Sequence, residues 1–479
     1  MKKWILEFQH LFWYAIIILL PISSMPLVRK MVGSDTVASP SIIPLIILCV
    51  IWLVYGLMGD LHLSKSVLPL ALFFGFALVV TCLSFFYQLP AYKAFNEIGA
   101  PLNAIATLII GSLFFITASS FPVFPKIKEN TLRLLNWGGF FIILWSAMQA
   151  ISWYSMNGYP QWMFNFQGLF SSRVLYRQRV TGFALEPSWL AHQLNLVYLP
   201  YWFSATLKRY SSFKFKFFRF SLENILLAAG IITLGLTLSR VGYLAFLSMA
   251  IFVLWMIHKK LVNKICLWII ERKEMDHKPM FQTRRLVSLG LICSYIFTAF
   301  ALLVLYSRLD PRMMTLFSFQ LDSDNPLLRY FNELKFGDSV IYWLAGWKIF
   351  NEYPVFGVGL GNAGFYIPQN IEPFGWSLIE VRRLINRELI LLNIKSLWLR
   401  LLAESGIIGF SLFFGWLISL IAIFLKKIRS RIHINQVLGL MGILSLLAMI
   451  FEGFSIDSFA MPYWWVALGF SASLHQQLS

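Results

Sequence analysis

The chain has 479 residues, of which 58% are hydrophobic and only 13% are charged, and its mean hydropathy is +0.69. Soluble domains carry about 25% charged residues, so this composition excludes an ordinary soluble enzyme. The net charge of +18 would suit a nucleic-acid-binding protein, but most of the basic excess lies in short loops between apolar runs. That placement is typical of membrane topology and contact with anionic lipid, and predicts a bilayer partner and no nucleic acid.

Apolar runs about long enough to cross a bilayer as helices recur from end to end. They predict an all-α, polytopic integral membrane protein with about twelve transmembrane helices. The first run has no small-residue cleavage site, so we expect a retained anchor. The predicted spans are residues 10–27, 42–58, 67–88, 101–123, 134–156, 184–207, 221–238, 241–257, 286–306, 396–425, 436–454 and 459–475.

Lys and Arg set the orientation, because cytoplasmic loops carry an excess of both. With both termini inside, the predicted inner segments hold 23 of the 40 Lys and Arg residues. Cysteines are few and absent from the outer loops, and His is scattered, so we expect neither a disulfide framework nor a zinc site. We divide the chain into N-terminal spans, motif-bearing spans, one long outer loop and C-terminal spans, at 1–156, 157–306, 307–395 and 396–479.

The stretch TGFALEPSWLAH, residues 181–192, opens the sixth span with a carboxylate and a proline. A charge in hydrocarbon costs about 2.5 to 3.5 kcal/mol, and Pro removes a backbone donor that lipid cannot replace. Both are tolerated where a segment lines a wet cavity or a packed interior. The preceding outer loop adds cations, so the polar side chains predicted to gather here are Arg173, Arg177, Arg179, Glu186 and Ser188.

The seventh and eighth spans form a tight hairpin, LTLSRVGYLAF, whose tip, Ser239-Arg240, is expected at the outer end. The long outer loop follows the ninth span. Its segment DSVIYWLAGWKIFNEYP predicts a helix that begins near Asp338 and stops before Pro354. The glycines of FGVGLGNAGFY predict a tight turn with close backbone approach. No βαβ unit surrounds them, so we do not interpret them as a nucleotide loop.

A second amphipathic helix is predicted over residues 376–395. Its Arg382, Arg383 and Arg387 could face lipid headgroups or an anionic ligand, or the helix could be a plain surface helix with a Glu380–Arg383 pair. Trp343 and Trp347 in the first loop helix are candidates for stacking on sugars. The tenth span begins near Lys395, and its Arg400 and Glu404 share a helix face, which suits a structural ion pair or a charged cavity.

These motifs, in this order, resemble the O-antigen ligase/polymerase family, which includes Wzy-type polysaccharide polymerases and the lipopolysaccharide O-antigen ligase. The resemblance covers residues 170–420 and is carried by TGFALEPSWLA, LTLSRVGYLA, W-x10-P-x2-G-V-G-x-G and LLAESGIIGF. It implies a GT-C-like glycosyltransferase fold with a long extracytoplasmic loop between spans nine and ten, in the bacterial cytoplasmic membrane. It also implies transfer of glycans from undecaprenyl pyrophosphate at the outer face, without metal or other cofactor.

The residue match is uneven. Arg179, Arg240, Trp343 and Pro354 fit the family pattern. The family's Gly-Arg before that Trp is replaced by Asp338-Ser339, and its His-Asn before the tenth span by Lys395-Ser396. That His is the proposed general base of the ligase, so its absence favours a polymerase. Glu-Pro-Ser in place of Asn-Pro-Asn also resembles a polymerase subgroup.

We therefore interpret Glu186 as the general base and Arg240 as the catalytic cation. The pyrophosphate would be held by Arg173, Arg177, Arg179 and Lys395, with Ser188, Ser239, Arg400 and Glu404 behind them. The alternative is that Glu186 only packs the bundle through an ion pair with Arg179 or Arg240.

Three functions remain open: a repeat-unit polymerase, which we favour, a ligase that moves a finished glycan to a terminal acceptor, and a transporter of lipid-linked units. A transporter would show internal repeats and broken helices, and the sequence indicates neither. The expected partners are lipid-linked glycan donor and acceptor, the bilayer, and flippase and chain-length regulator proteins.

Overall fold

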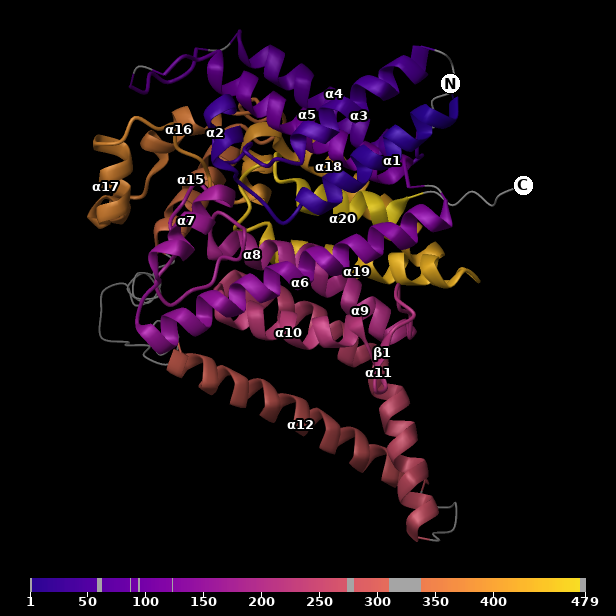
Figure 1. Cartoon of the computed structure of the whole chain (residues 1–479). Helices are drawn as coiled ribbons and strands as arrows, with labels where there is room; N and C mark the ends of the chain where they lie inside the picture. Colours follow the sequence, from indigo (N-terminus) through magenta and orange to yellow (C-terminus); the bar gives the residue numbers. More distant parts are fainter. Residues whose placement is uncertain are drawn as a thin grey trace. The chain divides into compact units, whose positions relative to one another are not determined.

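The computed structural model describes residues 2–57, 63–86, 88–93, 95–122, 124–273, 280–309 and 337–473. These residues are mainly helical, with one short antiparallel pair of strands, β1 (Lys216–Phe217) and β2 (Phe220–Ser221). The helices, labelled in Figure 1, are α1 (Lys2–Leu19), α2 (Pro26–Val32), α3 (Ile42–Leu57), α4 (Val67–Ser84), α5 (Gly99–Ser120), α6 (Pro125–Met156), α7 (Gln161–Phe170), α8 (Pro187–Gln193), the π-helix η1 (Leu194–Tyr198), α9 (Leu199–Lys208), α10 (Leu222–Leu236), α11 (Arg240–Lys273), α12 (Met280–Leu309), α15 (Gly337–Glu352), α16 (Ala363–Asn370), the 3-10 helix η3 (Pro373–Ser377), α17 (Ile379–Asn386), α18 (Leu397–Ile428), α19 (His433–Glu452) and α20 (Pro462–Ala472).

Seven of the described helices are long and apolar enough to cross a membrane, which supports the predicted all-α, polytopic membrane protein. Three shorter apolar helices lie within α1, α3 and α10. Each of the twelve predicted spans overlaps a helix or a run of consecutive helices. The number of helices that cross the bilayer, and the GT-C-like arrangement, stay predictions.

Several predicted boundaries are wrong. The first span was predicted to reach residue 27, but α1 ends at Leu19, because Pro21 follows and the chain turns before α2. The predicted inner loop 258–285 is largely helical, since α11 runs to Lys273 and α12 starts at Met280. The helix predicted over 376–395 ends at Asn386, where Lys93 Nζ donates to the Leu384 carbonyl that a longer helix would use.

Segments predicted to be outer loops contact one another at one end of the helices. Ser172 Oγ donates to Asp35 Oδ1 at 2.5 Å, and Asn393 Nδ2 donates to Asp457 Oδ2 at 2.9 Å. Segments predicted to be inner contact one another elsewhere, as Arg133 Nε does with the Ser212 carbonyl at 2.8 Å. This grouping agrees with the predicted topology, although the side that faces the cytoplasm stays a prediction.

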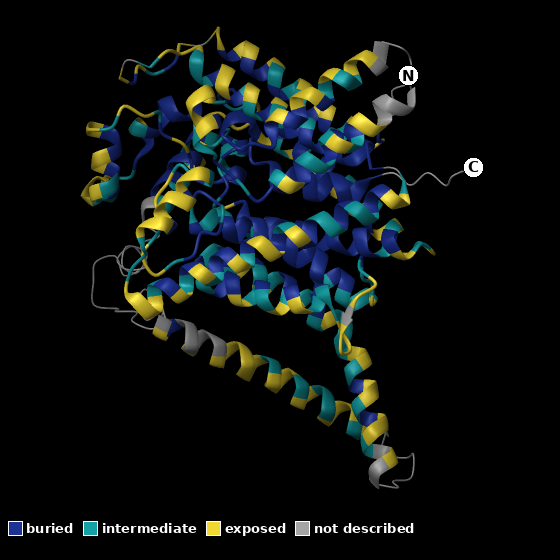
Figure 2. Ribbon diagram, in the orientation of Figure 1, coloured by how far each residue is buried: buried dark blue, intermediate teal, exposed yellow. Residues whose placement is uncertain are grey.

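The chain divides into two compact units, one formed by residues 1–245 with 341–479 and the other by residues 246–340. In the first, α18 packs against α4 and α19, and α20 packs against α5 and α19. Its core is rich in tryptophan: Trp416, Trp464 and Trp465 are each at most 1% exposed. In the second, the apolar stretch of α12 has no buried residue, and Figure 2 shows it largely exposed or half-buried. Such a surface suits contact with lipid.

The predicted helix after Asp338 is α15, which ends at Glu352 just before Pro354. The glycine-rich segment then runs beside a break in α18, where Gly406 has φ 61° and ψ −170°. Backbone amides of Val358 and Gly359 donate to the carbonyls of Ala403 and Glu404, each at 2.9 Å. A Cβ on Gly357, whose φ is 72°, would lie 2.6 Å from the Ala403 carbonyl oxygen. These glycines are therefore required for close backbone packing.

The break in α18 contradicts our expectation that no helix would be broken. Nothing in LLAESGIIGF required a break, because one Gly inside a helical pattern is tolerated. The carbonyls and amides freed at Gly406 are bonded by the glycine-rich segment, including the Ile407 amide, which donates to the Pro354 carbonyl at 2.8 Å. Irregular backbone at membrane depth needs such internal partners.

Candidate functional site

The arginine loop between α7 and α8 lies on the tip of the α10–α11 hairpin. Arg179 Nε donates to the Thr237 carbonyl at 2.8 Å, and the Val180 amide donates to the Leu236 carbonyl at 3.1 Å. The tip residues Ser239 and Arg240 follow directly, and Arg240 is half-buried at the first position of α11. The structure thus brings the Arg179 segment to the Ser239-Arg240 tip, which the sequence placed on the same face only through topology.

Glu186 stands at the N-terminal boundary of α8, immediately before Pro187, in an extended conformation with φ −138°. Its carboxylate forms an ion pair with the Arg173 guanidinium and accepts a hydrogen bond of 3.3 Å from Ser188 Oγ. The alternative prediction, an ion pair with Arg179 or Arg240, is therefore wrong in its partner. The pair is only half-buried, with 47% of the Arg173 side chain and 30% of the Glu186 side chain exposed.

Arg173 has a second partner besides Glu186, because its Nη1 also donates to Tyr176 Oη at 3.1 Å. Partial burial lowers the pKa of Arg173, but the Glu186 carboxylate, Tyr176 and Asp35 together raise it by more, so the pKa lies above its ordinary value. The guanidinium is a permanent cation. Arg177 is exposed, and no described residue forms a hydrogen bond or ion pair with it.

Gln149 in α6 is a residue that the sequence reasoning missed. It is fully buried, and its Oε1 accepts hydrogen bonds from the Thr181 and Gly182 amides at 2.9 and 3.1 Å. Gly182 has φ 54°, a conformation that favours glycine. Gln149 therefore fixes the turn that leads from Arg179 to Glu186. The available signal was an amide side chain near the end of an apolar span.

Lys395 lies in a second group, at the start of α18. Its Nζ pairs with Glu380 Oε1 at 2.8 Å and lies 4.6 Å from the centroid of the Tyr342 ring. Its carbonyl accepts from Trp343 Nε1 at 3.3 Å. Ser396 caps α18, since its side chain accepts from the Leu399 amide. A shared role of Lys395 and the arginine loop in binding pyrophosphate stays a prediction.

Arg400 and Glu404 form the expected structural pair, with Nε and Oε2 2.9 Å apart and both side chains largely buried. Arg400 Nη1 also donates to the Asp457 carbonyl at 2.5 Å, which ties α18 to the loop before α20.

The candidate side chains on the long loop do not form one group. Trp343 packs on Phe454, with ring centroids 5.4 Å apart.

The remaining loop candidates lie on the surface. Trp347 is 47% exposed. Glu380 forms its ion pair with Lys395, and Arg383 with Glu388 at 2.9 Å, in place of the expected Glu380–Arg383 pair. Arg382 reaches the Ser377 carbonyl, and Arg387 is exposed. A role for these side chains in ligand contact stays a prediction.

A buried polar network beneath the hairpin tip was also missed. His192 Nε2 lies 3.3 Å from Glu452 Oε2, and both side chains are at most 1% exposed. Asn195 Nδ2 donates to Glu452 Oε1 at 2.6 Å and to the Gly242 carbonyl at 2.8 Å. Asn195 lies in the π-helix η1, a distortion that is frequent at functional sites. The network fixes the first turn of α11, which carries Arg240.

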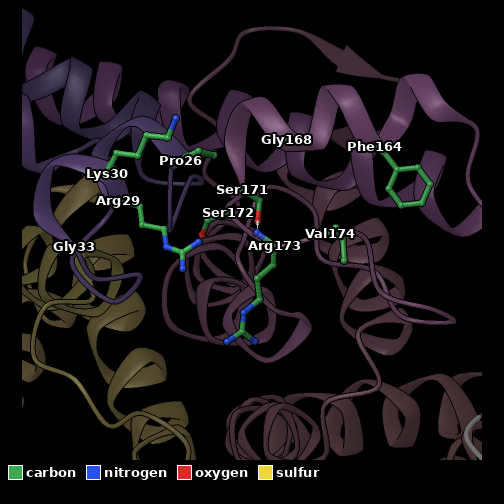
Figure 3. Close-up of a pocket in the computed structure, with 10 residues that line it drawn as sticks. All are labelled: Pro26, Arg29, Lys30, Gly33, Phe164, Gly168, Ser171, Ser172, Arg173 and Val174. Carbon is green, nitrogen blue, oxygen red and sulfur yellow. Dashed lines mark hydrogen bonds between the residues drawn. The ribbon is translucent and has the colours of Figure 1, made fainter. Parts of the chain in front are cut away.

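A cavity of about 510 Å³ opens between α2, α7 and the start of the arginine loop. Figure 3 shows ten residues that line it, three of which are cations: Arg29, Lys30 and Arg173. The cavity therefore adjoins the Arg173–Glu186 pair. The sequence reasoning missed Arg29 and Lys30, because the short outer loop after the first span carries no motif.

Comparison with known protein families gives a match over part of the chain. Residues 225–414 match a family model described as O-antigen ligase. This range includes the hairpin tip, α15, the glycine-rich segment and the first half of α18. No curated protein matches the chain. Over these residues, which are less than half of the chain, the protein is similar to the O-antigen ligase family.

Proposed function

We propose that this protein polymerises oligosaccharide repeat units carried on undecaprenyl pyrophosphate, at the outer face of the bacterial cytoplasmic membrane. The observation that carries the proposal is the attachment of the arginine loop to the hairpin tip through Arg179 and Thr237. It gathers cations for a pyrophosphate on the same loop that ends at the Glu186 carboxylate. The O-antigen ligase domain match supports glycan transfer in general.

In the proposed reaction a sugar hydroxyl of the acceptor attacks the anomeric carbon of the donor glycan. The new glycosidic bond forms as the bond from that carbon to the pyrophosphate oxygen breaks, so the configuration inverts. Glu186 takes the hydroxyl proton, and lipid pyrophosphate leaves with the bonding electrons. Arg240 and Arg179 stabilise its developing charge, and Arg177 and Lys395 help to bind it.

Two observations bear on the ligase, the second candidate. The family model is described as O-antigen ligase, which favours it. Against it, Lys395-Ser396 stands where the family's ligase has the His-Asn of its proposed base, and Lys395 is engaged by Glu380. A transporter is disfavoured because the Ala403 and Glu404 carbonyls and the Ile407 amide, at the break in α18, are bonded within the protein and not open to a cargo.

The test is a deletion strain complemented with wild type, Arg240→Ala or Glu186→Gln, with the surface glycan separated on a gel. For a polymerase, deletion leaves single repeat units on the final acceptor, and neither variant restores long chains. Full-length chains stranded on the lipid carrier would instead identify the ligase. If no unit reached the outer face, the proposed active site would be wrong and the transporter would be favoured.

A further inference from the structure

We infer that the cavity between α2 and α7 is an anion subsite that takes the phosphate headgroup of a lipid, and that it holds the carrier pyrophosphate of the acceptor chain. The second part rests on the proposed polymerase function. The inference starts from the cavity of about 510 Å³ lined by Arg29, Lys30 and Arg173. In Figure 3 these cations extend from α2 and the start of the arginine loop, with Arg29 between Lys30 and Arg173.

The cations are available to a ligand to different degrees. Arg29 Nε pairs with Asp35 Oδ1 at 3.1 Å, but the same oxygen also accepts from Ser172 Oγ at 2.5 Å and Ser24 Oγ at 3.1 Å. Asp35 is thus shared among three donors, while a guanidinium has five N–H groups. Lys30 is exposed and has no ion pair with any described residue. The cavity can therefore offer N–H groups to an incoming phosphate.

The surroundings of the cavity are apolar and exposed, which points to a lipid. On α2, Leu27 and Met31 are 61% and 77% exposed, and on α7, Trp162 and Leu169 are 52% and 61% exposed. Val174, which lines the cavity, is 75% exposed. Short helices with exposed apolar side chains beside cations are typical of segments that lie in the membrane interface. A lipid with a phosphate headgroup would place the phosphate on the cations of the cavity and its apolar chain on the exposed apolar side chains.

Arg173 connects the cavity to the proposed base. It lines the cavity and also pairs with Glu186, so a phosphate in the cavity competes with that carboxylate for the same guanidinium. An acceptor held there would weaken the ion pair and leave Glu186 able to take a proton. The donor pyrophosphate would lie at Arg179 and Arg240. A polymerase needs both sites, because each of its substrates ends in a lipid pyrophosphate.

The binding test counts lipids on the purified full-length protein by native mass spectrometry, with undecaprenyl pyrophosphate as the probe. Wild type should carry two, while Arg29→Gln/Lys30→Gln and Arg240→Ala should each carry one. All three substitutions together should leave none. The control Lys426→Gln/Arg429→Gln removes the same charge from exposed residues of α18 and the segment after it, and should carry two. Two lipids on the Arg29/Lys30 variant would overturn the subsite.

Further probes separate the sources of phosphate. Undecaprenyl pyrophosphate should bind the Arg29/Lys30 variant about 10-fold more weakly at the second site, as expected for loss of hydrogen bonds to a charged group. Phosphatidylglycerol that competes equally well would reduce the cavity to a general lipid site. Inorganic pyrophosphate that binds as tightly would show that no lipid chain is needed. Either result overturns the assignment to the acceptor.

Glycan gels distinguish this inference from the proposed function. In the deletion strain, Arg29→Gln/Lys30→Gln should shorten the chains, whereas the control variant should restore their full length. If binding falls but chain length stays normal, the subsite does not serve the acceptor. If deletion leaves finished chains on the carrier, the polymerase function fails, and a change in lipid count would then establish a phosphate-lipid site without an acceptor role.

Discussion

Replacing Glu186 by Gln should abolish transfer while leaving the fold almost unchanged. The Arg173–Glu186 pair is 47% and 30% exposed, and exposed ion pairs contribute only about 0.2 to 1 kcal/mol to stability. A general base, in contrast, contributes about 10²- to 10⁴-fold to the rate. The structure therefore predicts a large loss of rate with a free energy of unfolding lowered by less than about 1 kcal/mol.

The matched variant is Arg173→Gln, which breaks the same ion pair but keeps the carboxylate. Both variants would be assayed for glycan transfer to a purified lipid-linked acceptor and for thermal unfolding in detergent. Glu186→Gln should lower kcat, and Arg173→Gln should mainly raise KM. An equal loss of kcat in the two variants would mean that Glu186 contributes only through its ion pair with Arg173. A Glu186→Gln protein within about threefold of wild-type kcat would refute the base assignment outright, because the smallest expected loss is about 10².

Three further substitutions probe the framework of the site, each read by thermal or denaturant unfolding. Gly357→Ala should destabilise the protein by about 2 to 4 kcal/mol through its left-handed φ and a clash with the Ala403 carbonyl, whereas Gly75→Ala, in an open part of α4, should not. Arg400→Leu should cost about 3 to 5 kcal/mol because it leaves the buried Glu404 carboxylate unpaired, whereas Arg383→Leu, at a 58% exposed side chain, should cost less than about 1 kcal/mol. Gln149→Leu should cost about 2 to 4 kcal/mol by leaving two buried amides without their acceptor, and should also reduce transfer and speed hydrogen exchange at residues 181 and 182. Equal stability within either matched pair, or normal exchange in the Gln149 variant, would contradict the packing described here.

The sequence predicted the helices well where a long apolar run decided the outcome. It also predicted α15 from the helical pattern and the proline that follows it, although Asp338 is the second residue of the helix and not its cap. It failed where tertiary contacts decide the ends or the continuity of a helix. At the end of α17, Lys93 Nζ binds the Leu384 carbonyl. At the break in α18, the glycine-rich segment replaces part of the helical hydrogen bonding. Neither contact has a local signal.

The candidate site was also predictable only in part, because some of its contacts join segments that are distant in the sequence. The predicted topology placed Arg179, Glu186 and Arg240 on one face, and the structure joins the Arg179 segment to the Arg240 tip. The partner of Glu186 could not be chosen from sequence, because three arginines precede it in the same loop and the most distant of them forms the pair. The Asn195–Glu452 contact joins residues 257 positions apart, and no pattern within either segment indicates the other.

The bonded break in α18 has a consequence for membrane insertion. A helix interrupted at Gly406 leaves amides and carbonyls that hydrocarbon cannot satisfy, and their partners lie about 45 residues earlier, in the segment after α15. In the predicted topology that segment is already translocated when α18 enters the bilayer. The nascent loop would then act as a template on which the tenth span completes its hydrogen bonding. A chain with the glycine-rich segment deleted should accordingly stall at this span and be degraded, even though the apolar length of α18 is intact.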